Sequence, residues 1–298
     1  MKLLKRIVVG HDLSKGGDVA LQSSLSLAAT ANAEIKVVHV IEPHPFYEKL
    51  THPVSTHQIP TQLAQAAGKR LEGTLSASGR FRQQLQYEVC VGKPFVELIV
   101  AGRAWEADLL VIGESSEPDG YSLGSTGEHV IRKSRIPVLV TKRPVNLHPK
   151  TILVPVDFSA GSKKAAVEAL SLAECFRARL VFFHVIDLYA YFASTYGDDV
   201  YEMMPAVSEK DLEPEWHSFL GALALENVSW VKRTEEGSPA KTIVKRAEAE
   251  NADLIVIGTH GRTALNFTFL GSVTAKVARG ARCPVLAIRP DAFEFALP

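Results

Sequence analysis

The sequence has few cysteines and no long hydrophobic run, and each shortage excludes a class of protein. Its three cysteines, Cys90, Cys175 and Cys283, are far apart in the chain and odd in number. They match neither a disulfide framework nor a zinc-binding pattern, so we expect reduced thiols and a cytoplasmic protein. No apolar run approaches the roughly 20 residues that a membrane helix requires. Ile7 to Val9 is too short for the core of a signal peptide.

The chain also lacks an excess of either charge. Lys plus Arg and Asp plus Glu both number 33, which gives a formal net charge of zero. A protein that coats nucleic acid needs a basic excess, so we expect no nucleic-acid partner. The remaining composition, 46% hydrophobic and 22% charged over 298 residues, is typical of a globular protein with two domains of ordinary size.

The two halves of the chain repeat each other. Ile7 recurs as Ile152, and the motifs that follow keep the same offset of 145 positions (152 minus 7). The offset becomes 147 only at Gly124 and Gly271 (271 minus 124), so the net length difference lies inside one glycine-containing loop. The repeated segments are 7–14 and 152–159, 39–41 and 184–186, 111–113 and 256–258, and 137–139 and 284–286. The repeat predicts two domains, 1–146 and 147–298.

Each half alternates short apolar strands with helical segments. The first half predicts strands near 7–9, 35–41, 85–91, 109–112 and 136–141, with a long polar loop over 43–60. It predicts helices after Ser14, over about 61–77, from Pro94 and after Gly124. The strands are continuously apolar, as in parallel sheets covered on both faces. We therefore expect an α/β, doubly wound fold in each half.

The stretch after the fourth strand of the second half has the properties of a phosphate site. Gly258, Gly261 and Gly271 lie between an apolar strand and a predicted helix. Glycines let backbone N–H groups approach a phosphate, and a helix start favours anions. Arg262 could add charge, and Asp157 could reach a ribose hydroxyl or a phosphate-bound magnesium ion. The spacing matches neither the P-loop nor the dinucleotide fingerprint, so a glycine-rich turn without a ligand stays open as an alternative.

Four features of the second half together resemble the universal stress protein family in a tandem form. They are the glycine spacing, the start at Val154 to Ser159, the strand end at His184 to Ile186 and the terminus at Cys283 to Leu286. The resemblance implies a five-stranded parallel sheet in each half, order 3-2-1-4-5, with helices on both faces. It also implies an internal pseudo-dimer in which the last strands of the two halves pair. It implies ATP, with or without magnesium, as the ligand: adenine near Val185, the ribose region at Asp157 and the triphosphate on the glycine loop. The predicted site consists of Val156, Asp157, Val185, Gly258, Thr259, Gly261, Arg262, Gly271, Ser272, Val273 and Thr274.

The first half departs from this pattern in its loop. Ser116 replaces the middle glycine, the spacer is shorter, and Glu114, Glu117 and Asp119 add three acids where a triphosphate would lie. We predict that this half binds ATP weakly or not at all. Gly113→Ala should then leave nucleotide binding intact, whereas Gly261→Ala should abolish it.

Other polar and aromatic residues have simpler interpretations. His39 and His184 are expected as hydrogen-bonded core histidines, and His44, His52 and His57 as a solvated loop rather than a metal site. The aromatic insert at 189–204 is expected to pack on its domain, with an apolar ligand or protein partner as the alternative.

The sequence thus predicts a stress-response regulatory protein that binds ATP in its C-terminal half. No nucleophile–base pair is evident, so we expect no catalysis. One alternative is a slow ATPase in which Asp157 holds magnesium and Arg262 or His260 stabilises charge; another is a scaffold without nucleotide. The chain is expected as a monomer, acting as a pseudo-dimer, or as a homodimer.

Overall fold

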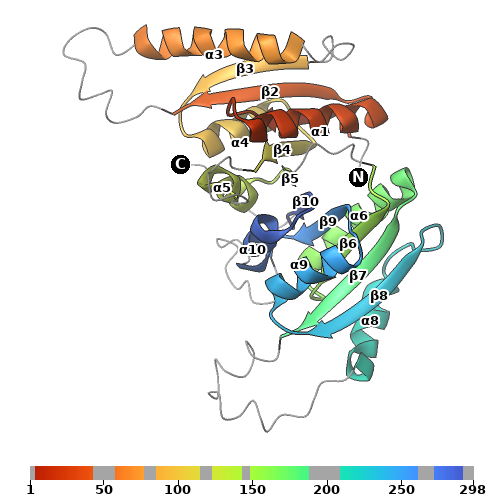
Figure 1. Cartoon of the computed structure of the whole chain (residues 1–298). Helices are drawn as coiled ribbons and strands as arrows, with labels where there is room; N and C mark the ends of the chain where they lie inside the picture. The colour runs from red at the N-terminus through yellow and green to blue at the C-terminus, as the bar shows by residue number, and fades with distance from the viewer. Residues whose placement is uncertain are drawn as a thin grey trace, which may run out of the picture. The chain divides into compact units, whose positions relative to one another are not determined.

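The chain folds into two units with the same architecture (Figure 1). The structure, a computed structural model, describes residues 4–42, 58–76, 85–114, 123–142, 148–187, 209–260 and 272–290. One unit covers Lys2–Leu147 and the other His148–Glu294. We refer to them as the N-terminal and C-terminal units.

The N-terminal unit is a parallel sheet with strand order β3-β2-β1-β4-β5. Its strands are β1 (Arg6–Gly10), β2 (Glu34–Ile41), β3 (Leu85–Val91), β4 (Leu109–Gly113) and β5 (Val138–Thr141). Its helices are α1 (Lys15–Ala31), α3 (Gln58–Ser76), α4 (Pro94–Ala104) and α5 (Ser125–Lys133). The predicted order is confirmed. One boundary was wrong, because residues 58–60, expected in a loop, form the first turn of α3.

The C-terminal unit repeats this order as β8-β7-β6-β9-β10, again with parallel pairs. Its strands are β6 (Thr151–Val156), β7 (Arg179–Ile186), β8 (Trp230–Glu236), β9 (Leu254–Gly258) and β10 (Val285–Ile288). Its helices are α6 (Ala160–Phe176), η3 (Glu209–Leu212), α8 (Glu213–Leu220), α9 (Pro239–Ala249) and α10 (Ser272–Gly280). Both units are therefore doubly wound α/β domains with helices on both faces of the sheet.

The central strands of both sheets are apolar because both of their faces are covered. Ile7, Val8 and Val9 of β1 have no exposed surface, and neither have Ile152, Leu153 and Val154 of β6. The helix that follows each of these strands begins at a serine. Ser14, as predicted, accepts from the N–H groups of Gly16 and Gly17, and Ser159 accepts from that of Ser162. These caps fix where α1 and α6 begin, next to the carboxyl ends of β1 and β6.

The structure also bears on the cysteines, on membrane-spanning helices and on metal-binding groups. Cys90, Cys175 and Cys283, all within the described ranges, are not joined by disulfide bonds. No helix within the described ranges has the length and apolar character needed to cross a membrane. The same ranges contain no group of three or more His, Cys, Asp or Glu side chains suited to a metal ion. His44, His52, His57 and the insert at 189–204 lie outside the described residues.

Candidate functional site

An aspartate turn follows the first strand of each unit. Asp157 Oδ1 accepts from the backbone N–H of Ser159 at 3.1 Å and from its hydroxyl at 2.6 Å. Asp12 Oδ1 accepts from the N–H and the hydroxyl of Ser14 in the same way. Between them, Leu13 and Phe158 have φ angles of 63° and 62°, so the chain reverses through the left-handed region. The turn holds one carboxylate at the carboxyl end of the sheet in each unit.

A histidine on the neighbouring strand supports each turn. His39 Nδ1 lies 2.7 Å from the carbonyl oxygen of His11, and His184 Nδ1 lies 2.7 Å from that of Val156. Because a carbonyl oxygen can only accept, both Nδ1 atoms donate. The predicted hydrogen bonds of His39 and His184 are confirmed, but both residues are half-buried rather than part of the core.

The glycine that ends the fourth strand is required by packing. A Cβ on Gly113 would lie 2.0 Å from the carbonyl oxygen of Gly16 in α1, and one on Gly258 would lie 2.8 Å from the backbone of Gly161 in α6. Both glycines therefore let the first helix of the unit approach the end of the strand. That Gly113→Ala leaves nucleotide binding intact stays a prediction, and the added methyl group would displace backbone, so this substitution also disturbs packing.

In the C-terminal unit, a threonine connects the start of α10 to β9. The Thr274 hydroxyl donates to the carbonyl oxygen of Gly258 at 2.7 Å, and the side chain is 2% exposed. The Thr259 hydroxyl lies 2.8 Å from Nδ1 of His260, and both residues are buried. The helix start, which carries unpaired N–H groups, is thus held against the end of the strand. Gly261, Arg262 and Gly271 lie outside the described residues, as does the side chain of Ser272.

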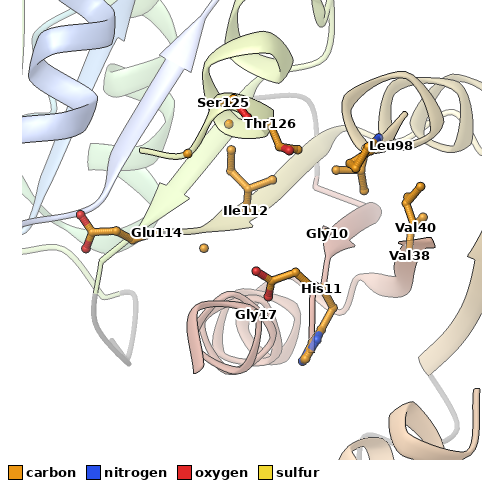
Figure 2. Close-up of a pocket in the computed structure, with 15 residues that line it drawn as sticks. Gly10, His11, Gly17, Val38, Val40, Leu98, Ile112, Glu114, Ser125 and Thr126 are labelled. Atoms are coloured by element: carbon orange, nitrogen blue, oxygen red, sulfur yellow. The ribbon is translucent and has the colours of Figure 1, made fainter. Parts of the chain in front are cut away.

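In the N-terminal unit, the same region encloses a cavity of about 260 Å³ (Figure 2). Backbone and side chains of β1, β2, β4, α4 and the starts of α1 and α5 line it. Its lining contains the counterparts of every predicted site residue except Gly261 and Arg262. These counterparts are His11, Asp12, Val40, Gly113, Glu114, Gly124, Ser125, Thr126 and Gly127.

Glu114 does not contribute the charge that the sequence suggested. Its Oε1 lies 2.7 Å from Nζ of Lys142, and the two side chains are 11% and 1% exposed. In Figure 2 the carboxylate of Glu114 points away from Ile112 and Ser125. The expectation of three acids facing a triphosphate is therefore wrong for Glu114, because Lys142 neutralises it. Glu117 and Asp119 lie outside the described residues.

Sequence reasoning missed Lys142, which pairs with Glu114, and it missed several apolar residues that line the cavity. Val38, Pro94, Leu98 and Ile112 come from three different elements, so no local pattern connects them. A usable signal for Lys142 was its counterpart Arg289, another buried cation directly after the last strand of the repeat.

The chain has two tandem doubly wound domains, and each has an aspartate turn, a strand-end glycine and a helix start at the carboxyl edge of its sheet. This arrangement defines a class of α/β proteins that bind small ligands at that edge. The family model of the "Universal stress protein family" matches residues 4–142 and again 148–289. The chain therefore belongs to the universal stress protein family, in its tandem form, and the resemblance inferred from the sequence is confirmed.

Individual relatives agree with this assignment. A universal stress protein of Methanocaldococcus jannaschii is 37% identical over 153 residues, which cover 48% of this chain and 84% of the relative. A universal stress protein of Mycolicibacterium smegmatis is 24% identical over 300 residues, which cover 95% of this chain and 97% of the relative.

A solved structure that covers both units has the same fold. A universal stress protein from Archaeoglobus fulgidus superposes with a TM-score of 0.71 at 21% identity and covers 97% of this chain and 99% of its own. A universal stress protein solved in complex with cAMP aligns with 47% of this chain and 97% of its own, at 26% identity and a TM-score of 0.33. The cAMP is bound to that relative.

Proposed function

We propose that this protein is a stress-response regulator that binds an adenine nucleotide, ATP, in its C-terminal unit. The observation that carries the proposal is the cavity of the N-terminal unit. The predicted ATP residues of the C-terminal unit correspond to residues that line a real cavity in the other copy of the same fold. The strand order is the same in the two units, so the corresponding residues occupy the same end of the sheet.

The described contacts of the C-terminal unit support an anion at this end. Thr274 ties the start of α10 to Gly258, at the end of β9. Since β6 pairs with β9, the Asp157 turn that follows β6 belongs to the same edge. A nucleotide would then have its ribose beside Asp157 and its phosphates at the N–H groups that open α10.

A difference between the two units favours the C-terminal one for a triphosphate. Uncharged Thr259 stands where the N-terminal unit has Glu114, whose charge Lys142 already balances, so the difference in charge lies in the loop itself. Gly261 and Arg262, which the first copy replaces with Ser116 and Glu117, would add a position without a Cβ and a positive charge.

The contacts favour binding without hydrolysis. One oxygen of Asp157 is already engaged by Ser159, and His260 is buried with Nδ1 beside the Thr259 hydroxyl. A general base must reach the proton that it removes, and a packed histidine is poorly placed for that role. If magnesium accompanies ATP, the carboxylate of Asp157 is the described group suited to hold it, since Mg²⁺ prefers oxygen ligands.

Titration calorimetry of the full chain with Mg-ATP tests the proposal. We expect one ATP per chain in the wild type, with affinity reduced about tenfold or more in Asp157→Asn, because a charge-assisted hydrogen bond is worth about 1.5 kcal/mol or more. Asp12→Asn is the matched control in the other unit and should leave ATP affinity unchanged. If ATP binding is lost in Asp12→Asn but kept in Asp157→Asn, the nucleotide binds in the N-terminal unit and the proposal is wrong.

Native mass spectrometry of the freshly purified protein provides a second test. Co-purified ATP in a one-to-one ratio would support the proposal, and no nucleotide in either assay would favour a scaffold. Phosphate release that exceeds that of Asp157→Asn would instead favour the slow ATPase.

A further inference from the structure

The two aspartate turns have the same backbone conformation but are held by different contacts. Leu13 and Phe158, which directly follow the two aspartates, have φ angles of 63° and 62°. A residue with a side chain adopts this left-handed conformation only where its surroundings stabilise it. The groups that contact Leu13 and Phe158 therefore determine where each carboxylate lies.

In the N-terminal unit the contacts of the turn are polar. The N–H of Leu13 donates to Nδ1 of His11 at 3.0 Å, and its carbonyl oxygen accepts from Arg70 on α3 at 3.3 Å. The positions 145 residues after His11 and Arg70 are Val156 and Glu215. A valine side chain has no acceptor and a carboxylate has no N–H group, so neither contact can recur in the C-terminal unit.

Aromatic rings surround the turn of the C-terminal unit instead. The ring centroid of Phe158 lies 4.6 Å from that of His184 on β7. It lies 5.1 Å from that of Trp216 and 6.0 Å from that of Phe219, both on α8, with interplanar angles of 85° and 81°. Such edge-to-face arrangements are favourable for aromatic pairs. Phe158 is thus held between β7 and α8.

Trp216 is itself fixed in place. It is 1% exposed, and its indole N–H donates to the hydroxyl of Thr234 on β8 at 3.4 Å. Helix α8 therefore lies beside β7 and β8 (Figure 1). The position 145 residues earlier is Leu71 on α3, which is also buried. Neither Leu71 nor Leu13 has a ring, so the aromatic contact between helix and turn is a property of the C-terminal unit.

We propose that Trp216 and Phe158 are positioning residues for Asp157, and that α8 regulates ligand binding at this carboxylate. With α8 in place, Trp216 holds the Phe158 ring, and the turn presents Asp157 with its Oδ1 engaged by Ser159. Displacement of α8 releases the turn and weakens ligand binding. Because such coupling is reciprocal, a ligand bound at Asp157 also stabilises the docked position of α8. The part that concerns the ligand rests on the ATP site proposed for this unit.

The first test requires no ligand. The Ser159 N–H donates to Asp157 at 3.1 Å, so its hydrogen exchange, measured by NMR in the full chain, reports on the turn. Trp216→Leu introduces the side chain that Leu71 has. We expect exchange at Ser159 to become about threefold to tenfold faster, which corresponds to the loss of one aromatic pair. Trp216→Phe keeps a ring and should retain most of the protection.

Two further variants separate the ring contact from general effects on stability. Phe158→Gly removes the ring but keeps the left-handed backbone, which glycine adopts freely. It should accelerate exchange at Ser159 as Trp216→Leu does, and it decides the question if Trp216→Leu fails to fold. Ile243→Ala removes a buried side chain from α9 in the same unit. It should accelerate exchange at Ser159 no more than at Ile255 in β9.

Calorimetry with Mg-ATP tests the coupling to the ligand. Affinity should fall about threefold to tenfold in Trp216→Leu and stay close to that of the wild type in Trp216→Phe and Ile243→Ala. If the wild type binds no ATP, or if Asp157→Asn binds it unchanged, the proposed function fails. Exchange at Ser159 then still decides whether α8 positions the turn.

Two results would overturn the proposal. One is exchange at Ser159 that, relative to Ile255, is no faster in a folded Trp216→Leu or Phe158→Gly protein than in Ile243→Ala. The other is ATP binding at Asp157 in the wild type with an affinity that neither substitution changes.

Discussion

His11 is a buried titratable side chain that the C-terminal unit lacks. Its Nε2 lies 3.2 Å from Oδ1 of Asp18, its Nδ1 accepts from the N–H of Leu13, and its side chain is 1% exposed. Val156 occupies the same place after β6. Burial lowers the pKa of His11 below its ordinary value of 6.5, and the charges of Asp18 and Asp12 offset part of that effect.

The lowered pKa of His11 predicts that acid weakens the N-terminal unit. In the unfolded chain the imidazole binds a proton below about pH 6.5, whereas the folded unit resists protonation. Stability should therefore fall as the pH drops below that value, until His11 is protonated in the folded state as well. His11→Val should flatten this part of the profile, measured by urea unfolding between about pH 7.5 and 5.

The control is His217→Gln, which changes an exposed histidine on α8 and should leave the profile as it is. An unchanged acid dependence in His11→Val would contradict the assignment to His11.

Thr274 carries a prediction that connects stability with binding. Thr274→Val keeps the shape of the side chain and removes the hydrogen bond to Gly258. We expect a loss of about 1–2 kcal/mol in the free energy of unfolding, because a buried carbonyl loses its donor. We also expect weaker ATP binding, since the start of α10 is no longer fixed. Denaturant unfolding and calorimetry measure the two effects.

Thr30→Val is the matched control for this change. The Thr30 hydroxyl donates to the carbonyl of Ser26 in an exposed turn of α1, so its loss should cost less than about 0.5 kcal/mol. Equal effects of the two substitutions would show that the Thr274 contact has no special role.

At the scale of elements, one glutamate joins three parts of the C-terminal unit. Glu250, just after α9, lies 3.4 Å from Arg179 at the start of β7, 3.7 Å from Arg233 on β8 and 3.5 Å from Arg246 on α9. Its side chain is 12% exposed, so solvent screens these pairs less than it screens surface pairs. The cluster holds the edge of the sheet against α9.

Glu250→Gln should destabilise the C-terminal unit by about 1–2 kcal/mol, because three arginines lose a shared partner. Added salt should reduce the difference between the two proteins in denaturant unfolding. Glu248→Gln is the control, since Glu248 pairs with Arg282 where the side chains are 45% and 72% exposed. It should cost less than about 0.5 kcal/mol, and a similar cost for both would contradict the shared-partner role.

The elements themselves were largely predictable from the sequence, because their signals are local. Short apolar runs gave the strands, and Ser14 and Pro94 marked helix starts that the structure confirms. The contact between Glu114 and Lys142 was not predictable in this way. It joins residues 28 positions apart that meet because β4 and β5 pair. The close approach of Gly16 to Gly113 depends likewise on how α1 packs on the sheet.

At the scale of the whole molecule, the two units differ in how well their shared fold should accept ATP. The fold and the aspartate turns are the same, so the difference lies in a few side chains at the strand ends. His11, Glu114 and Gly127 in one unit stand where Val156, Thr259 and Thr274 stand in the other. These differences predict that ATP binds in the C-terminal unit rather than in the N-terminal one.

Hydrogen exchange measured by mass spectrometry can assign ATP to one unit of the intact chain. A ligand at 100 times its dissociation constant stabilises the state that binds it by about 2.7 kcal/mol, which slows exchange in the unit that contains the site. We expect ATP to protect peptides from β6, β9 and α10 and to leave peptides from β1, β4 and α5 unchanged. Asp157→Asn should remove this protection, whereas Asp12→Asn should leave it intact. Equal protection of both units by ATP would contradict the assignment, because it would mean that the side chains that differ at the strand ends do not select between the two units.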